Sequence, residues 1–253
     1  MSQGVLVTAG ASGIGREIAR AFAAAGARVF VVDLDADGLA VLADEIPGLR
    51  TAVCDLSRRA DVERMVPQAV EALGGLDVLV NNAGIAGPTA PVEEYDPDAW
   101  DEVVQVNLTG TFNTTRLAIP HLKKSSAGVI IIMSSMAGRF GYPNRSAYCA
   151  TKWGLIGLTK TLAQELGAFG IRANAILPGC VAGPRIEKVF EGRASLSGRS
   201  VEEEISDALS NQSLQRLVDP RDVAALAVYL ASDAAKSISG QMLPIDNDTQ
   251  QAS

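Results

Sequence analysis

The sequence predicts an α/β protein in which helices cover both faces of one doubly wound parallel β-sheet, all in a single domain. Short apolar runs alternate with helical stretches along the chain, which is typical of such a sheet. The run Val129–Met133 is apolar at every position, as expected for a strand buried on both faces. No Pro/Ser-rich linker and no repeat divides the 253 residues, so residues 1–253 are expected to form one domain.

The expected elements follow one another from the N-terminus. A helix is predicted over residues 16–25, closed by Gly26, and two long helices over 108–124 and 148–169. Asp96-Pro97 and Asp219-Pro220 each place a capping carboxylate before a proline at the first helical position. The predicted strands are residues 5–7, 29–32, 51–54, 78–80, 129–133 and 173–177.

Composition excludes several classes of partner. The net charge of −7 argues against nucleic acid or an anionic membrane. No apolar run approaches the roughly 18 residues of a membrane span, and no secretory leader is evident, so a cytoplasmic protein is expected. Cys54, Cys149 and Cys180 lack metal-ligand spacing. Buried free thiols are the simpler interpretation, although oxidation sensitivity of the last two stays open. His121 is interpreted as a helix-end residue, and no metal site is expected.

A strand, a Gly-rich turn and a helix occur in that order at the N-terminus. The turn spans residues 10–15 and directly follows the first strand. Small residues let the backbone approach a pyrophosphate, which the N–H groups of the next helix stabilise. Such a turn is often only a tight loop, but this context favours a dinucleotide site. The residues expected to contact the cofactor here are Gly10, Ser12, Gly13, Ile14 and Gly15.

Asp33 ends the next strand, about 20 residues past the glycines. A carboxylate at this place accepts hydrogen bonds from the adenosine ribose and repels a 2′-phosphate. No basic residue occupies Ser12 or Leu34, where one could neutralise that phosphate. The expected cofactor is therefore NAD rather than NADP, with Asp33 and Leu34 beside its ribose.

Tyr148 and Lys152 are four residues apart, and Tyr148 lies 13 residues after Ser135. On a helix, positions i and i+4 share one face. A free phenol has a pKa of about 10 and is a poor base at neutral pH, but a nearby cation stabilises phenolate and lowers that pKa. The spacing alone could arise by chance. Together with the Gly-rich turn it predicts a proton shuttle.

With these motifs, the chain resembles the short-chain dehydrogenase/reductase family over nearly its whole length. Residues 8–15 are similar to the family's Gly-rich motif, residues 81–84 to its Asn-Asn-Ala-Gly motif, and Pro178-Gly179 to its Pro-Gly turn. The resemblance implies a Rossmann-like fold and four catalytic residues, Asn107, Ser135, Tyr148 and Lys152. Besides Tyr148 and Lys152, the further cofactor contacts that it implies are Asp55, Leu56, Asn82, Ala83, Gly84, Pro178, Gly179 and Val181.

The sequence departs from the family pattern at three places. Ala9 replaces the first motif glycine, and Gly10 beside it is expected to relieve the same turn. Gly183 stands four residues after Gly179, where the family usually has a Thr that contacts the cofactor. This indicates a reshaped loop over the nicotinamide. Residues 246–248 read Asp-Asn-Asp rather than the Asp-Gly-Gly of many members.

The resemblance implies NAD-dependent oxidation of a secondary alcohol, or the reverse. Tyr148 would remove the hydroxyl proton as hydride leaves for the nicotinamide, and Ser135 would hold the substrate oxygen. Lys152 would lower the Tyr148 pKa and bind the nicotinamide ribose. Asn107 would anchor a water that links Lys152 to solvent; an Asn that kinks its helix is compatible with this role. Strand alternation turns Ser134 away from the site.

The substrate is less well defined by the sequence. Residues 183–213 correspond to the family's variable lid, and the expected substrate contacts are Arg139, Asn144, Arg145 and Arg185. Arginine suits carboxylate or phosphate recognition. A solvated amphipathic helix would also explain the lid charges, because Glu187 and Glu191 lie among them. With 5% aromatic residues, a small polar substrate is favoured: a polyol, sugar or sugar acid, in the last case anionic.

Two alternatives stay open: a ketoacyl-thioester reductase, and a non-catalytic NAD-binding regulator on the same fold. The complete Asn/Ser/Tyr/Lys set favours an enzyme. Related proteins pack the two long helices against a two-fold mate, so a homotetramer is expected, with residues 241–253 at a second interface. Thr109, Thr111, Thr114, Thr115, Trp153, Leu155 and Leu158 would supply the first, although periodicity equally allows the leucines to face the core.

Overall fold

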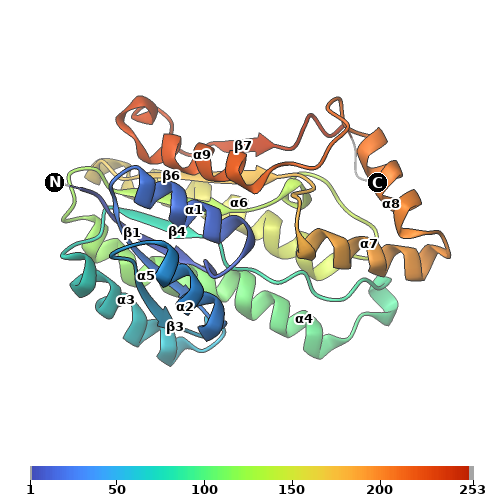
Figure 1. The fold of residues 1–253 in the computed structure, drawn as a ribbon, viewed down its shortest axis with the longest axis horizontal. Helices are drawn as coiled ribbons and strands as arrows, with labels where there is room; N and C mark the ends of the chain where they lie inside the picture. The colour runs from blue at the N-terminus through green and yellow to red at the C-terminus, as the bar shows by residue number, and fades with distance from the viewer. Residues whose placement is uncertain (1, 251–253) are drawn as a thin grey trace.

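Seven parallel strands form one sheet in the order β3-β2-β1-β4-β5-β6-β7 (Figure 1). The computed structural model describes residues 2–250. The order reverses between β1 and β4, so chain segments that leave these two strands diverge and open a crevice there. The strands are β1 (Gly4–Thr8), β2 (Arg28–Asp33), β3 (Arg50–Val53), β4 (Val78–Asn81), β5 (Val129–Met133), β6 (Arg172–Pro178) and β7 (Met242–Ile245).

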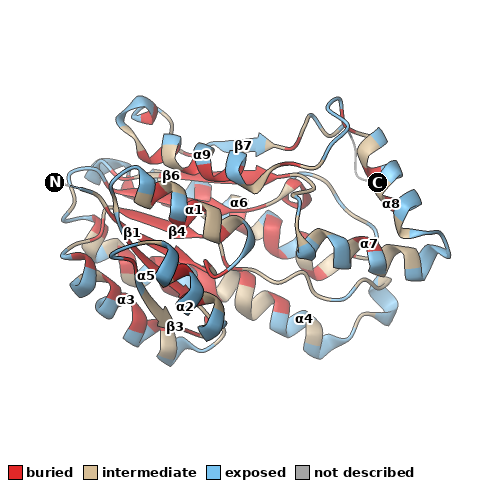
Figure 2. Cartoon of the chain, in the orientation of Figure 1, coloured by how far each residue is buried: buried red, intermediate tan, exposed pale blue. Residues whose placement is uncertain are grey.

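Helices cover both faces of the sheet, as a doubly wound fold requires. They are α1 (Gly13–Ala24), α2 (Ala36–Glu45), α3 (Arg59–Leu73), α4 (Pro97–Val104), α5 (Thr111–Leu122), α6 (Ser146–Leu166), α7 (Pro184–Ser197), α8 (Val201–Ser210) and α9 (Pro220–Ala231). Figure 2 shows their buried sides turned toward the sheet and their exposed sides toward solvent. No helix within residues 2–250 is long and apolar enough to cross a membrane.

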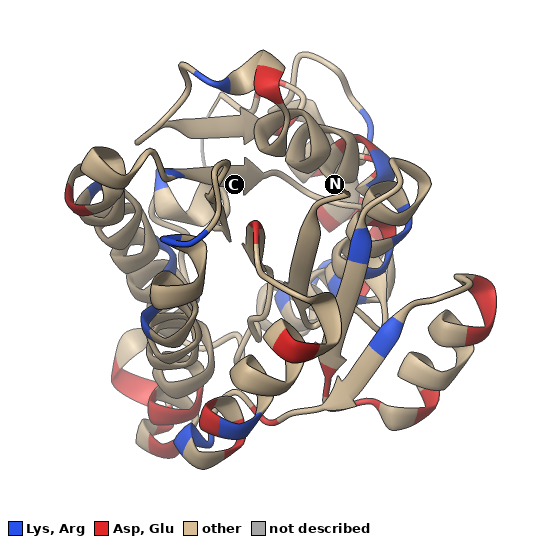
Figure 3. Cartoon of the chain, turned by 90° about the vertical axis from the view of Figure 1, so that its left-hand side faces the viewer, with Lys and Arg blue, Asp and Glu red and all other residues tan. Residues whose placement is uncertain are grey.

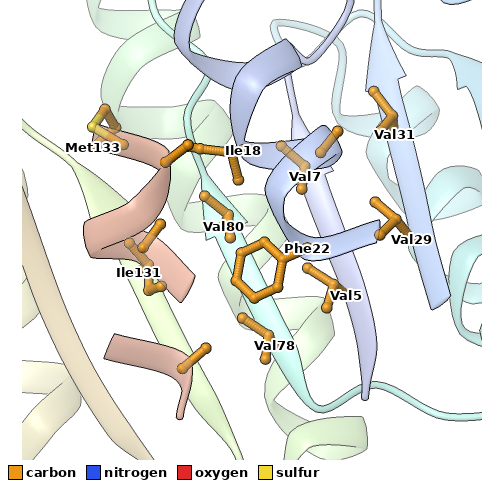
Figure 4. Close-up of a cluster of buried hydrophobic side chains, with 14 of the residues drawn as sticks. Val5, Val7, Ile18, Phe22, Val29, Val31, Val78, Val80, Ile131 and Met133 are labelled. Carbon is orange, nitrogen blue, oxygen red and sulfur yellow. The ribbon is translucent and has the colours of Figure 1, made fainter. Parts of the chain in front are cut away.

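Each strand contributes side chains to two separate cores, because successive residues point to opposite faces. Val5 and Val7 pack with Phe22 of α1 on one face (Figure 4), whereas Leu6 joins the core on the other face. The first core also includes residues of α2 and α9, and the second includes residues of α3, α5 and α6. The predicted single-domain α/β fold is therefore confirmed.

Six strands match the sequence prediction, and β7 was missed. The predicted strand 51–54 is displaced by one residue from β3 (Arg50–Val53). Strand β7 is short, half-exposed and contains Pro244, features that suit an edge strand and give little apolar signal. Both predicted helix starts are confirmed: Asp96 accepts from Asp98 N at 3.0 Å, and Asp219 accepts from Arg221 N at 2.8 Å.

The predicted helix 108–124 is wrong at its start. A π-helical turn, Gln105–Gly110, joins α4 to α5, which begins at Thr111. The predicted helix 148–169 begins earlier, at Ser146, and ends at Leu166 before a 3-10 turn over Gly167–Phe169. A π turn shifts the register of the side chains by one position, which apolar periodicity does not reveal.

The interface face predicted on the two long helices needs correction. Thr111, Thr114, Thr115 and Leu155 are buried within the chain. Thr111 and Thr114 donate to the carbonyls of Asn107 and Gly110, four residues earlier. Trp153, which was predicted for this face, is 51% exposed, and the other large apolar side chain exposed on α5 and α6 is Phe112, 50% exposed, which was not predicted. Part of the predicted interface segment 241–253, residues 251–253, lies outside the described residues.

Charged positions of both signs are interspersed over the helices (Figure 3). Within residues 2–250, no group of three or more His, Cys, Asp or Glu side chains is placed to hold a metal ion. Cys54 and Cys149 are buried and Cys180 is partly buried, and all three are free thiols. Burial raises the pKa of Cys54 to about 11, so this thiol is unreactive at neutral pH.

Candidate active site

A cavity of about 610 Å³ lies at the carboxyl ends of the strands. Its wall is formed by the segments that follow β1, β2, β3, β4, β5 and β6, together with α6, residues 184–193 of α7, and one residue each of α4 and of the π-helical turn. Open α/β sheets bind ligands in this place, at the point where the strand order reverses. The residues predicted for catalysis and cofactor binding line this wall, with the exceptions of Gly10 and Asn107.

The Gly-rich turn presents open backbone to one end of the cavity. Gly13 has φ +54° and no heavy atom within 4 Å of where a Cβ would stand, so a ligand can approach its backbone closely. A Cβ at Gly15 would overlap Ala9 O and lie 2.5 Å from Asn82 Nδ2. Helix α1 begins here and no side chain caps its N-terminus, which leaves its N–H groups available to an anion. This cradle fits a pyrophosphate.

Gly10 does not relieve the turn as expected, because Ala9 itself adopts the left-handed conformation with φ +52°. Gly10 instead packs closely against Val31 of β2, because a Cβ on Gly10 would lie 2.5 Å from Val31 Cγ1. Asn82 holds the strained peptide by donating from Nδ2 to Thr8 O at 3.1 Å and to Ala9 O at 2.9 Å. The absent motif glycine is thus replaced by a strained alanine and not by its neighbour.

Two carboxylates, Asp33 and Asp55, also line the cavity. Asp33 Oδ2 accepts from Ala11 N at 2.9 Å, which fixes the carboxylate beside the Gly-rich turn. Leu34 next to it is 65% exposed. Asp55 accepts from Ser57 Oγ at 2.6 Å. Arg16, the first arginine after the Gly-rich turn in the sequence, forms an ion pair with Glu45.

Tyr148 and Lys152 lie on the cavity side of α6, one turn apart. Lys152 is 2% exposed, and its Nζ donates to Met133 O at 2.8 Å. Burial lowers the pKa of Lys152 to about 8, against the opposing attraction of the Tyr148 oxygen. Burial alone would raise the pKa of Tyr148, but Lys152, Arg185, a hydrogen bond from Ser135 and Arg145 outweigh it, and the pKa falls below its ordinary value. The Tyr148 phenol therefore loses its proton more readily than an ordinary tyrosine does.

Of the two serines that follow β5, Ser135 is the one that acts on Tyr148, where it lowers the pKa of the phenol. Ser135 Oγ also accepts from Ala137 N at 3.1 Å, which fixes it at the start of a 3-10 turn, Met136–Gly138. Ser134 Oγ donates instead to Lys152 O at 2.9 Å and so fastens α6 to the strand end. The alternation argument for Ser135 agrees with this geometry.

Asn107 lies in the π-helical turn and is fully buried. Its side chain accepts from Ile85 N at 2.7 Å and donates to Ile85 O at 3.0 Å and Thr151 Oγ1 at 3.2 Å. The structure thus ties the loop after β4 to α6 through this one amide. That Asn107 also anchors a water stays a prediction.

Two of the four predicted substrate contacts lie in the cavity wall. Arg145 and Arg185 line the cavity, whereas Arg139 and Asn144 do not. Arg139 lies against the Phe140 ring, and Asn144 has φ +62° in a turn whose carbonyl accepts from Ala90 N. Tyr142 and Arg193 also line the cavity and were not predicted as contacts. The helical spacing of 185, 189 and 193, which places them on one face, is the signal that could have found Arg193.

Comparisons with known proteins agree with this geometry. The model of a family described as Enoyl-(Acyl carrier protein) reductase matches residues 8–247. The chain is 41% identical over 246 residues to D-beta-hydroxybutyrate dehydrogenase of Cupriavidus necator, covering 95% of each chain. It superimposes on a variant of actinorhodin polyketide ketoreductase with NADPH (TM-score 0.94, 33% identity, 98% and 97% covered). It also superimposes on NAD+-bound xylitol dehydrogenase (TM-score 0.92, 28% identity, 96% and 97% covered).

The chain belongs to the short-chain dehydrogenase/reductase family. It is an oxidoreductase that interconverts alcohols and ketones with a nicotinamide cofactor. The Rossmann-like fold and the order of the family motifs along the chain are confirmed together.

Proposed function

We propose that this protein is an NAD-dependent dehydrogenase of a small, polar secondary alcohol. The observation that carries the proposal is the position of Tyr148, whose pKa is lowered by Lys152 and Ser135 at the wall of a cavity that begins at a Gly-rich cradle. A phenol in this state suits proton exchange with a substrate hydroxyl near neutral pH.

In this proposal Tyr148 takes the hydroxyl proton during oxidation and returns it during reduction. Ser135 donates to the substrate oxygen and stabilises the charge that develops on it. Lys152 keeps the Tyr148 pKa low, and its bond to Met133 O fixes its position. NAD, when bound, accepts or supplies the hydride. Asn107 keeps the loop after β4 in place and, with Lys152, gives the proton a route to solvent.

The choice of NAD over NADP rests on Asp33 and Leu34. Asp33 is fixed at the cavity wall by Ala11 N, where its charge would repel a 2′-phosphate. Leu34 offers no compensating cation, and Arg16 is already paired with Glu45. The adenosine half is proposed to lie between Asp33 and Asp55, and the pyrophosphate over Ser12–Gly15. On the nicotinamide side, Asn82, Ala83, Gly84, Pro178, Gly179 and Val181 line the wall.

The substrate proposal draws on the relatives' names and on the cavity. One relative acts on D-beta-hydroxybutyrate, and a solved neighbour is a xylitol dehydrogenase; both names describe small polar alcohols. Residues 183–213, which include α7 and α8, are proposed to cover the substrate. A cytoplasmic homotetramer is proposed for the assembly, consistent with the exposed Phe112 and Trp153.

The deciding experiment is a dehydrogenase screen of the purified protein. Polyols, aldonates, hydroxy acids and cyclic alcohols are each offered with NAD+ and with NADP+, and absorbance of the reduced cofactor is followed. We expect turnover with NAD+ that Tyr148→Phe abolishes while NAD+ affinity changes little, because the phenol acts in chemistry. Lys152→Ala is expected to lower both the turnover and the affinity for NAD+. A Tyr148→Phe variant that keeps a tenth of wild-type turnover would remove Tyr148 from the proposed role.

A ketoacyl reductase is the second candidate, favoured by the polyketide ketoreductase neighbour. A carrier-bound thioester would need a basic docking surface, and the chain carries a net charge of −7. Ketoacyl thioesters of coenzyme A and of a carrier protein therefore belong in the same screen, run in the reducing direction. Preference for such a thioester in kcat/KM would select this candidate.

A further inference from the structure

Three arginines surround the substrate end of the cavity. They are Arg145, the residue before α6, and Arg185 and Arg193 of α7; we call them the arginine cluster. The guanidinium carbons of Arg145 and Arg185 lie 5.0 and 5.8 Å from the centroid of the Tyr148 ring. That of Arg193 lies 5.8 Å from the centroid of Tyr142, another residue of the wall. Three positive charges from two elements are thus directed at one space.

The arginine cluster has no carboxylate partner. None of the ion pairs formed within residues 2–250 includes Arg145, Arg185 or Arg193. By contrast, Arg199, a surface arginine that follows α7, forms an ion pair in which its Nη1 lies 2.6 Å from Asp207 Oδ2. Glu187 and Glu191 of α7 are exposed and do not line the cavity. The solvated-helix interpretation therefore fits Glu187 and Glu191 but does not account for Arg185 and Arg193, which line the cavity although Arg185 is exposed and Arg193 is partly buried.

Arg145 is buried with hydrogen-bonding capacity unused. Its side chain belongs to a residue that is 6% exposed, and Nη2 donates to Ala86 O at 3.3 Å. Its Nε is buried and has no hydrogen-bond partner. Burial lowers the pKa of Arg145, and Arg193 and Arg185 lower it further. An unpaired buried charge is costly, and two like charges beside it add to the cost, so an anion placed among the three arginines would stabilise this arrangement.

We infer that the arginine cluster binds an oxyanion carried by the substrate, and that the substrate is a short hydroxy acid whose carboxylate lies a few bonds from the carbon that is oxidised. This rests on the proposed function, because it assumes that the hydroxyl meets Tyr148. The planar guanidinium fork matches a carboxylate in two-point contact. The cofactor phosphates have their own cradle at Ser12–Gly15, at the start of α1, so they do not account for the arginine cluster.

The test separates anion binding from catalysis. The protein is saturated with NADH, and malonate, acetate or inorganic phosphate is titrated while the fluorescence of bound NADH is followed. The variants are Arg185→Gln and Arg193→Gln, with Arg199→Gln as the matched control from the same segment. We expect malonate to bind, each cluster variant to weaken it about 10- to 100-fold, and the control to match wild type. Arg145→Gln is added with a thermal melt, since its burial can affect folding.

Three results would overturn the inference. Equal malonate affinity in all variants would remove the arginine cluster from anion binding. Loss of NADH affinity in the cluster variants, with malonate unaffected, would assign these arginines to the cofactor. Binding of phosphate without binding of malonate would exclude a carboxylate. Failure to bind NADH at all would instead contradict the proposed cofactor.

A kinetic comparison completes the test. Hydroxy acids that turn over are compared with their neutral amides, and the expected loss in kcat/KM for the amide equals the loss caused by Arg185→Gln or Arg193→Gln on the acid. Turnover confined to neutral polyols, unchanged in the cluster variants, would overturn the hydroxy-acid inference while the dehydrogenase proposal stands.

Discussion

Asn107 and Ile85 are joined by two reciprocal hydrogen bonds: Ile85 N donates to Asn107 Oδ1 at 2.7 Å, and Asn107 Nδ2 donates to Ile85 O at 3.0 Å. The pair ties the π-helical turn to the loop after β4, directly beside Gly84 in the cavity wall. A Cβ at Gly84 would lie 3.1 Å from Asn107 Oδ1 and 3.3 Å from Lys152 Nζ, so the wall is closely packed at this point.

Asn107→Leu is expected to destabilise the fold by about 2 kcal/mol, because it leaves the N–H and C=O of Ile85 unpaired in a partly buried site. Turnover should fall as well, since the wall beside Lys152 loses its support. Thr151→Val is the control, because it removes the third bond of Asn107 and keeps both bonds to Ile85. Chemical denaturation measures the free energy of unfolding. Equal stability of Asn107→Leu and Thr151→Val would contradict a special role for the Asn107–Ile85 pair.

Ala9→Gly is expected to stabilise the protein by about 1 kcal/mol, since glycine adopts φ +52° without the steric cost that alanine has there. The matched control is Ala11→Gly in the same turn. Ala11 does not have a positive φ, so glycine there should lower the stability of the protein. Thermal melts of both variants decide the matter. A lower melting temperature for Ala9→Gly would show that the alanine is not strained in solution.

The rate of alcohol oxidation is expected to rise with pH and to level off above the pKa of Tyr148. The active base is the Tyr148 phenolate, which predominates above the pKa of Tyr148, and that pKa lies below its ordinary value. Arg185→Gln removes a cation that lowers this pKa, so the midpoint of the kcat profile should move to higher pH. Arg199→Gln should leave it unchanged. A profile of Arg185→Gln that coincides with wild type would show that Arg185 does not act on Tyr148.

Asp33→Ala combined with Leu34→Arg is expected to move the preference in kcat/KM from NAD toward NADP. The change removes the repulsion of a 2′-phosphate and supplies a cation at a position that is 65% exposed. Asp33→Ala alone should weaken NAD binding without creating much NADP activity. If the unmodified protein already prefers NADP, the argument from Asp33 is wrong.

Phe112→Asp together with Trp153→Asp is expected to dissociate the proposed tetramer without unfolding the subunit, because both side chains are about half exposed in the single chain. Val92→Asp, at another exposed apolar residue, should leave the assembly intact. Light scattering reads the mass and circular dichroism the fold. A wild-type mass near 26.4 kDa, that of a single chain, at micromolar concentration would contradict the proposed tetramer.

The sequence predicted most of the sheet because the strands read as short apolar runs, and β5 is apolar at every position, as expected of a strand buried on both faces. It predicted Tyr148 and Lys152 to lie together because a helix places i and i+4 on one face. It did not predict the conformation of Ala9, since positive φ is a property of the backbone that an alanine does not indicate. The π turn at Asn107 and the exclusion of Arg139 depend on tertiary packing, which periodicity does not contain.

The division of the cavity between elements has a consequence for divergence of the enzyme. Tyr148 and Lys152 belong to α6, and Ser135 follows the end of β5. Arg185 and Arg193 belong to α7, in a separate segment of the chain that begins after β6. With the proposed roles, exchange of residues 183–213 for the matching segment of another family member would change which molecule is oxidised. Tyr148, Lys152 and Ser135 would be kept, and the Tyr148 pKa would change only through the loss of Arg185. The fold allows new substrate preferences to arise by replacement of one surface segment, at little cost to the rest of the protein.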